Sequence, residues 1–265
     1  MPADDIIRLV QSLGARHGFE KSVKIVRGAL FDDRCLLSVH HSALGDAPAS
    51  RLDAIARELG MPPELTETLP AALLAADIVH FGFEGGLKSE TYKIYLEYAS
   101  RTREAMQAAV PFPTLVHLAY KWNPRDRDAR SIARYTWLPC SSLGEIGTKI
   151  DAVASPSAAP VALRLALGLL DKVGTSTPAD RLFLMEVEED GNPRRSFDLN
   201  VYNARLRVGD IAGLLAEAIR DFDALARGGG SIFDQQAGSA LGHISAGVGR
   251  DGEEFATIYY GVEAR

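Results

Sequence analysis

This sequence has little cysteine, no net positive charge and no long apolar runs. Its 265 residues include only Cys35 and Cys140, without a Cys-x-x-Cys pattern, which excludes a disulfide framework and a cysteine-based zinc site. A formal charge of -6 argues against a nucleic-acid partner, because phosphate-backbone contacts need a concentrated basic field. No apolar run approaches the roughly 18 residues of a membrane span, and the N-terminal residues lack a secretory-signal pattern. We therefore expect a cytoplasmic protein without a membrane partner.

Several motifs of known enzyme classes are also missing. There is no GxxxxGK[ST] or GxGxxG motif after a strand, no GxSxG motif and no Cys–His nucleophile pattern. The Asp-x-Asp in residues 123–128, NPRDRD, falls in an expected hairpin turn. It therefore differs from the aspartate-rich helix that binds magnesium-diphosphate in all-helical prenyl synthases. The sequence predicts no metal site.

Five pairs of strand-like segments, each joined by a short turn, recur along the chain. They are residues 22–29 and 34–41, 76–84 and 91–99, 113–122 and 129–139, 180–190 and 194–203, and 241–249 and 254–262. Helical patterns surround them at residues 4–17, 51–60, 65–76, 100–109, 142–152, 160–173 and 209–226. In the first pair we expect the turn at Asp32 and Asp33. The recurrence indicates internal repetition within a single domain over residues 1–265.

Ten antiparallel strands can form either a closed barrel or an open sheet. A barrel has no edges, and the apolar face of each strand would contact helices outside while the polar face lines a lumen. In an open α+β sheet the polar faces would simply meet water. Alternation of polar and apolar residues alone does not distinguish the two.

The segment Glu90–Tyr98, ETYKIYLEY, has two such faces. One face is apolar and suited to burial: Tyr92, Ile94, Leu96 and Tyr98. The other carries an ammonium, a phenol and a carboxylate: Thr91, Lys93, Tyr95 and Glu97. Within an open sheet this second face would be exposed, and within a barrel it would line the lumen.

Five helix–hairpin–helix units, with a lysine and a tyrosine two residues apart on an early strand, resemble the ABBA-type aromatic prenyltransferases. The best local matches are GFEGGLKSETYKIYLEY at 82–98 and FATIYYGV at 255–262. The resemblance implies an α+β fold, a ten-stranded antiparallel prenyltransferase barrel ringed by helices. It also implies transfer of an allylic prenyl group, dimethylallyl or geranyl, from its diphosphate to an aromatic small molecule in bacterial secondary metabolism. No cofactor is required, and Mg²⁺ is allowed but not demanded.

This chemistry needs three kinds of group. Cations and phenols must hold the departing diphosphate, aromatic faces must stabilise the allyl cation, and a weak base must take the ring proton.

The resemblance assigns Lys93 as a diphosphate ligand, Tyr95 as a phenol donor or shield, and Tyr259 as a barrel-facing tyrosine of the last strand. Phe255 stands where the family often has another lysine, so one expected phosphate ligand is missing. The remaining candidates for the diphosphate and the cation, chosen because they share strand faces, are Arg34, His117, Lys121, Arg134 and Tyr202.

Asp198 and Glu97 are candidates to orient or deprotonate the acceptor. The strand of Arg134 also permits the opposite phase, in which Tyr135 and Trp137 face inward. The fourth hairpin contributes no cation to the chamber, and this thin cation set leaves open a barrel that binds or transforms a different small molecule. A third alternative is an interaction module with an open sheet.

Overall fold

The computed structural model describes residues 2–86, 90–154, 159–224 and 229–264. Its strands are β1 (Gly18–Val26), β2 (Ala29–Phe31), β3 (Arg34–His40), β4 (Ile78–Gly85), β5 (Glu90–Glu97), β6 (Thr114–Asn123), β7 (Asp126–Trp137), β8 (Phe183–Glu189), β9 (Arg195–Asn200), β10 (Leu241–Val248) and β11 (Glu254–Ala264). Its α-helices are α1 (Pro2–Gln11), α2 (Pro48–Glu58), α3 (Pro63–Thr66), α4 (Leu69–Leu73), α5 (Ala99–Gln107), α6 (Leu143–Ala154), α7 (Pro160–Gly174), α8 (Ala212–Asp221) and α9 (Gly229–Gln235).

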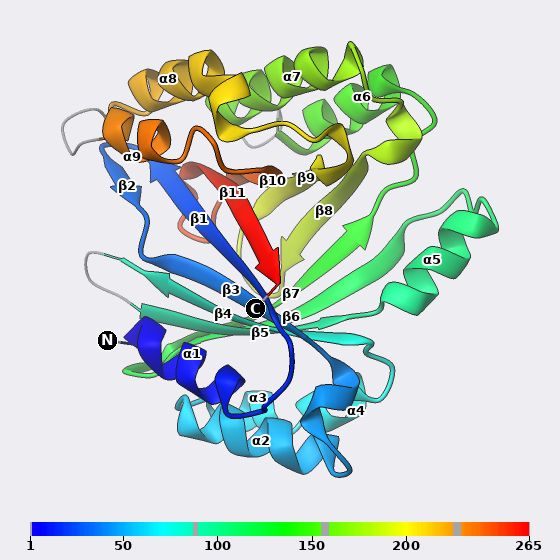
Figure 1. Cartoon of the computed structure of the whole chain (residues 1–265), viewed down its shortest axis with the longest axis vertical. Helices are drawn as coiled ribbons and strands as arrows, with labels where there is room; N and C mark the ends of the chain where they lie inside the picture. Colours follow the sequence, from blue (N-terminus) through cyan, green and yellow to red (C-terminus); the bar gives the residue numbers. More distant parts are fainter. Residues whose placement is uncertain (1, 87–89, 155–158, 225–228, 265) are drawn as a thin grey trace.

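The strands form a closed antiparallel barrel. Strands β3 to β11 pair in sequence order, β1 pairs with β3, and β11 pairs back with β1. The three-residue β2 pairs with β1 alone, so the other ten strands make the closed wall. Figure 1 shows helices packed around this wall. The predicted barrel of five hairpins ringed by helices is confirmed, and the open-sheet alternative is wrong.

The first hairpin turns earlier than expected. Val26 pairs with Ala29, which leaves Arg27 and Gly28 as a two-residue turn, and Gly28 has a φ of 69°. Glycine adopts positive φ without steric cost, so this position suits a tight hairpin turn. Asp32 and Asp33 instead interrupt the returning strand between β2 and β3.

Prolines set several helix boundaries. Pro48, Pro63 and Pro160 stand in the first turns of α2, α3 and α7, where a missing N–H costs no hydrogen bond. Pro70 stands in the first turn of α4, so the pattern over 65–76 becomes two short helices. The longest helix described, α7, has 15 residues, and no described helix is long and apolar enough to cross a membrane.

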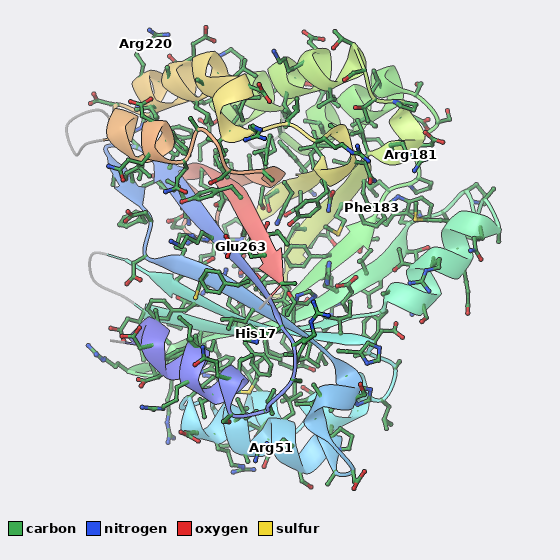
Figure 2. The ribbon with its side chains drawn as sticks, viewed as in Figure 1. His17, Arg51, Arg181, Phe183, Arg220 and Glu263 are labelled. Atoms are coloured by element: carbon green, nitrogen blue, oxygen red, sulfur yellow. The ribbon has the colours of Figure 1, made fainter. Side chains whose placement is uncertain are left out.

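Two apolar cores lie outside the barrel wall, on opposite sides. Helices α1–α4 pack on β3–β6, where Ile94 and Leu96 are fully buried and Trp122 donates from Nε1 to the Leu59 carbonyl at 2.9 Å. Helices α6–α9 pack on β1 and β8–β11. Figure 1 shows these two helix groups on opposite sides, and Figure 2 shows Arg51 of α2 and Arg220 of α8 on the outer surfaces. Burial of the outward strand faces leaves the inward faces to form a chamber.

Candidate active site

Two adjoining cavities inside the barrel form the chamber. The larger, of about 580 Å³, lies where the strands meet α5, and Thr102 and Met106 of that helix line it. The smaller, of about 360 Å³, lies at the hairpin-turn end and is lined by Gly249 and Arg250. Five residues line both cavities: Arg34, Glu84, Lys93, Tyr135 and Tyr259.

The polar row of ETYKIYLEY faces this chamber and not bulk water. Lys93, Tyr95 and Glu97 line the larger cavity, and Thr91 with Lys93 lines the smaller one. The alternate residues of β5 belong to the outer core. Lys93 has its pairing partner at Gly82, where an added Cβ would come within 3.3 Å of the Lys93 Cβ. The absence of a side chain at Gly82 therefore leaves room for the lysine to lie across the wall.

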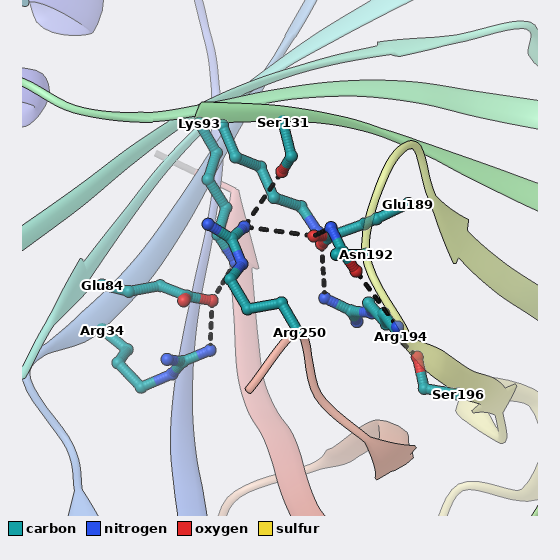
Figure 3. Close-up of polar contacts among 10 residues, drawn as sticks. Arg34, Glu84, Lys93, Ser131, Glu189, Asn192, Arg194, Ser196 and Arg250 are labelled. Atoms are coloured by element: carbon teal, nitrogen blue, oxygen red, sulfur yellow. Dashed lines mark hydrogen bonds and ion pairs between the residues drawn. The ribbon is translucent and has the colours of Figure 1, made fainter. Parts of the chain in front are cut away.

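Basic side chains gather at the hairpin-turn end, which we call the cation end. The smaller cavity is lined by six of them: Lys24, Arg34, Lys93, Lys121, Arg194 and Arg250. Figure 3 shows that two carboxylates, Glu84 and Glu189, hold most of this set in ion pairs. The chamber therefore contains a basic pocket although the whole chain is acidic.

Glu84 joins Arg34 and Lys93 where the two cavities meet. Both cations contact its Oε1, and Arg34 also donates from Nε to Ser22 Oγ at 3.1 Å. Burial favours the protonated form of Glu84, but Arg34 and Lys93 hold its pKa well below the usual range. Burial lowers the pKa of Lys93 to about 8, although Glu84 opposes the shift.

Glu189 organises the opposite wall of the cation end. Its side chain is fully buried and contacts Lys121, Arg194 at 2.9 Å and Arg250 at 3.2 Å. Burial again opposes ionisation, but these three cations hold the pKa of Glu189 well below its usual range. Asn192 completes the group with a hydrogen bond of 3.1 Å to the carboxylate.

Phe255 is part of the cation end although it is not a lysine. The Lys24 Nζ lies 4.9 Å from its ring centroid, and the Arg194 guanidinium carbon lies 5.4 Å from it. Both distances fall within the range of cation–π attraction. Neighbouring strands and turns therefore bring positive charge to the position where a lysine was expected, and the cation set is not thin.

Tyrosines line the middle of the chamber. Tyr95 and Tyr135 meet edge to face, with ring centroids 5.6 Å apart and an interplanar angle of 63°. Burial raises the pKa of Tyr135 to about 12, and it raises the pKa values of Tyr95 and Tyr259 by more than that of Tyr135. All three phenols are therefore neutral at physiological pH, and their rings can face a cation without carrying a formal charge.

One histidine–carboxylate cluster lies at the far end from the cations, which we call the histidine end. His80 contacts Ser38 Oγ through Nδ1 at 2.7 Å and Glu97 Oε2 through Nε2 at 2.7 Å. Burial disfavours ionisation of Glu97, but the hydrogen bond with His80 lowers its pKa to about 2. Burial lowers the pKa of His117 to about 3. One ligand atom from each of His80, Glu97 and His117 lies within 4.8 Å of the others.

A second cluster at the histidine end surrounds His243. Its Nδ1 lies 2.9 Å from both Asp198 oxygens, and its Nε2 lies 3.4 Å from Glu20 Oε2. The Tyr259 ring stacks on it at 3.8 Å, and Tyr202 donates its hydroxyl to Glu20. Burial opposes the imidazolium, but Asp198 and Glu20 outweigh it and raise the pKa of His243 to about 10.

This raised pKa predicts a pH dependence of stability. The imidazolium stabilises the fold fully below the unfolded pKa of 6.5, and this contribution is lost as pH rises through about 10. We expect His243→Gln to lower the free energy of unfolding by on the order of 4 kcal/mol at pH 6, with the difference from wild type shrinking towards pH 10. Urea unfolding of the wild type and of His243→Gln at pH 6, 8 and 10 measures this difference in the free energy of unfolding. A difference that stays constant over this window would contradict the prediction.

The structure places most of the sequence-derived site candidates in the chamber wall. Those that line it are Arg34, Lys93, Tyr95, Glu97, His117, Lys121, Asp198, Tyr202 and Tyr259. Tyr202 does so from the short helix Tyr202–Ala204 after β9 and not from the strand itself. The expectation that Arg134 reaches the chamber is wrong: its side chain is 47% exposed and pairs with Asp190. Tyr135 and Trp137 take the inward phase of β7, and Tyr135 lines both cavities.

Sequence reasoning missed the cations supplied by turns and the carboxylates that pair with them. Arg250 comes from the turn after β10, so no strand alternation points to it, whereas Arg194 immediately precedes β9 in the same phase as Asp198 and was overlooked. The expectation that the fourth hairpin adds no cation is therefore wrong. Glu84 and Glu189 stand near strand ends and look like ordinary solvent-facing acids. Only the strand register places them near lysines: Glu84 lies diagonally across the β4–β5 pair from Lys93, and Glu189 pairs with Ala133 of β7, the strand next to the one that carries Lys121.

The comparisons with known proteins address the fold. No family model and no curated protein matches the sequence. Among solved structures, the prenyltransferase PriB matches with a TM-score of 0.59 and 14% identity, covering 92% of this chain and 79% of that one. The 6-dimethylallyltryptophan synthase of Micromonospora olivasterospora, solved with DMASPP and Trp, gives 0.56 and 12%, covering 92% and 81%. The 5-dimethylallyltryptophan synthase of Streptomyces coelicolor gives 0.57 and 14%, covering 91% and 80%. The chain therefore has the fold of these enzymes, the prenyltransferase barrel.

Proposed function

We propose that this protein is an aromatic prenyltransferase. It would transfer a dimethylallyl or geranyl group from the diphosphate to an aromatic small molecule, as part of bacterial secondary metabolism. The observation that carries the proposal is the polarity of the chamber, with six basic side chains at one end and tyrosines, histidines and carboxylates towards the other. Two solved structures of the same fold support it, since one contains DMASPP and Trp and another brevianamide F and DMSPP.

The cation end would hold the diphosphate. Lys93 and Arg34 stand where the two cavities meet, so a diphosphate bound to them would direct its prenyl chain into the larger cavity. Lys121 lies directly across the β5–β6 pair from Lys93 and would contact the diphosphate from the next strand. In the absence of substrate, Glu84 and Glu189 neutralise these cations. A bound diphosphate would take over part of that role. Its attraction to the cations would grow stronger as the C–O bond breaks and negative charge develops on it.

The tyrosines would shield the allyl cation. When the C–O bond breaks, its electron pair leaves with the diphosphate, and the remaining positive charge lies beside Tyr95, Tyr135 and Tyr259. Their ring faces attract a cation and exclude water that would quench it. Tyr202 extends this wall at the edge of the larger cavity.

The histidine end would receive the aromatic acceptor. A carbon of the electron-rich ring attacks the allyl cation, and the alkylated ring then loses a proton to restore aromaticity. Glu97 and Asp198 line this part of the chamber, and either carboxylate, or His80 bonded to Glu97, would take that proton. The scheme needs no organic cofactor, and Mg²⁺ is optional because protein cations already face the diphosphate.

The test is a transfer assay with the purified protein, dimethylallyl and geranyl diphosphate, and a panel of aromatic acceptors that includes tryptophan. We expect prenylated product, diphosphate binding by calorimetry, and a donor affinity at least about tenfold weaker in Lys93→Ala, because a hydrogen bond to a charged group is lost. The matched control is Arg134→Ala, which removes an exposed cation outside the chamber and should leave donor affinity unchanged.

Absence of diphosphate binding, with Lys93→Ala behaving like wild type, would overturn the proposal. A different ligand that copurifies and is detected by native mass spectrometry would then favour the alternative, a barrel of this fold that binds or transforms another small molecule.

A further inference from the structure

Three adjacent strands bring two imidazoles and one carboxylate together in the chamber. His80 comes from β4, Glu97 from β5 and His117 from β6. Glu97 is the direct pairing partner of His117, and His80 pairs with Tyr95, two residues before Glu97. Side chains at such direct and diagonal positions on one face lie within reach of one another. No sequence spacing shows this group, because the register of the three strands assembles it.

The ligand atoms of this group already lie close together. One from each side chain falls within 4.8 Å of the others, and the His80 and His117 rings meet edge to face at 5.6 Å. In a tetrahedral site with metal–ligand bonds of about 2.1 Å, ligand atoms are about 3.4 Å apart. Small side-chain rotations would reach this geometry, with Glu97 moving away from His80, which it now contacts at 2.7 Å.

Two further features of this group fit a metal site. Ser38 Oγ holds His80 Nδ1 at 2.7 Å, which fixes the ring so that Nε2 faces Glu97. His117 Nδ1 is buried and has no hydrogen-bond partner among the described residues. A buried nitrogen without a partner costs free energy, which a bound cation or a shift of the ring on binding would recover.

We propose that His80, Glu97 and His117 bind one divalent first-row transition metal ion, with zinc the best match. Two imidazoles and a carboxylate are a ligand set of catalytic zinc sites, which keep a further position open. Mg²⁺ prefers oxygen ligands and fits this set poorly. All three residues line the larger cavity, so the open position faces the space where a small molecule binds and would polarise an oxygen of that molecule. This inference does not depend on prenyl transfer.

The test uses the full-length protein, stripped with a chelator and titrated with Zn²⁺ by calorimetry in the absence of any diphosphate. We expect the wild type to bind one ion per chain. The affinity should be at least about 100-fold weaker in Glu97→Gln and His117→Asn, which each lose a ligand. It should be about 10- to 100-fold weaker in Ser38→Ala, which loses only the contact that orients His80. Mg²⁺ should give no binding at this site. Titration of the wild type with Co²⁺, followed by its visible absorption, reports the coordination directly without any substitution.

The matched control is His40→Gln, which removes an exposed histidine of the neighbouring strand β3 and should keep wild-type affinity. Circular dichroism checks that each variant is folded. The proposal would be overturned if the wild type bound no Zn²⁺ or Co²⁺, or if Glu97→Gln and His117→Asn bound as tightly as the wild type. Loss of binding in His40→Gln would also overturn it, because it would identify an adventitious surface site.

Discussion

Replacing Glu189 with glutamine is expected to lower the free energy of unfolding by about 3–5 kcal/mol. The substitution keeps the shape of the side chain but removes the negative charge that faces Lys121, Arg194 and Arg250. The Lys121 side chain is 1% exposed and burial already lowers its pKa well below the usual range, so the variant leaves it either as an unpaired buried cation or as a neutral amine without its ion pair. A buried cation without a partner is far more costly than a missing ion pair on the surface. Urea unfolding at neutral pH measures the loss.

Inorganic diphosphate should recover part of this stability. An anion bound at the cation end replaces the missing charge, and a ligand that binds only the folded state stabilises it by mass action. We expect diphosphate to raise the unfolding midpoint of Glu189→Gln more than that of the wild type. The matched control is Glu188→Gln, an exposed neighbour on the same strand, which should be nearly neutral. If Glu189→Gln were as stable as this control, the assigned counter-ion role would be wrong.

The second large effect is expected for Arg34→Met, which should weaken binding of the prenyl diphosphate by about 10- to 100-fold. Arg34 is buried, stands where the two cavities meet, and is held by Ser22 and Glu84. It therefore presents a preorganised guanidinium to a diphosphate. Calorimetric titration with dimethylallyl diphosphate, or with a non-hydrolysable analogue, measures the affinity.

The single variant also leaves Glu84 with one cation fewer, so a loss of binding could follow from a damaged fold. Lys93 still pairs with Glu84 in this variant, so urea unfolding should show that most of the stability is kept while donor affinity is low. A donor affinity equal to that of the wild type would show that Arg34 acts only as a counter-ion for Glu84.

Much of the fold could be predicted from the sequence, because alternation and turn residues mark each hairpin locally. The five strand pairs and most of the helices between them follow from periodicity, and Pro70 marks the break between α3 and α4, whereas α9 had no counterpart among the predicted helices. Closure of the strands into a barrel could not be derived from local patterns in the same way. The alternation in Glu90–Tyr98 would be identical on a solvent-facing sheet, and only the pairing of β1 with β11 excludes that arrangement.

The candidate site was predictable only where a strand had one clear phase. On β5 the two faces differ plainly, and Lys93, Tyr95 and Glu97 line the chamber as a row. On β7 one face carries Ile132, Arg134 and Thr136 and the other carries Ser131, Tyr135 and Trp137, so each face mixes polar and apolar residues and the sequence left the phase of Arg134 undecided. The register irregularity between Leu115 and His117 on the partner strand adds an offset that local patterns do not show.

The seam between β1 and β11 also governs how the chamber is assembled. Gly18 pairs with Ala264, so the two edges of the wall lie at positions far apart in the chain, and such contacts form slowly. During synthesis the earlier hairpins can pair with one another, but both outer edges stay open until β11 has been made. That strand also carries Phe255 and Tyr259. β11, the last strand of the barrel in chain order, therefore completes the wall and the chamber lining in one step.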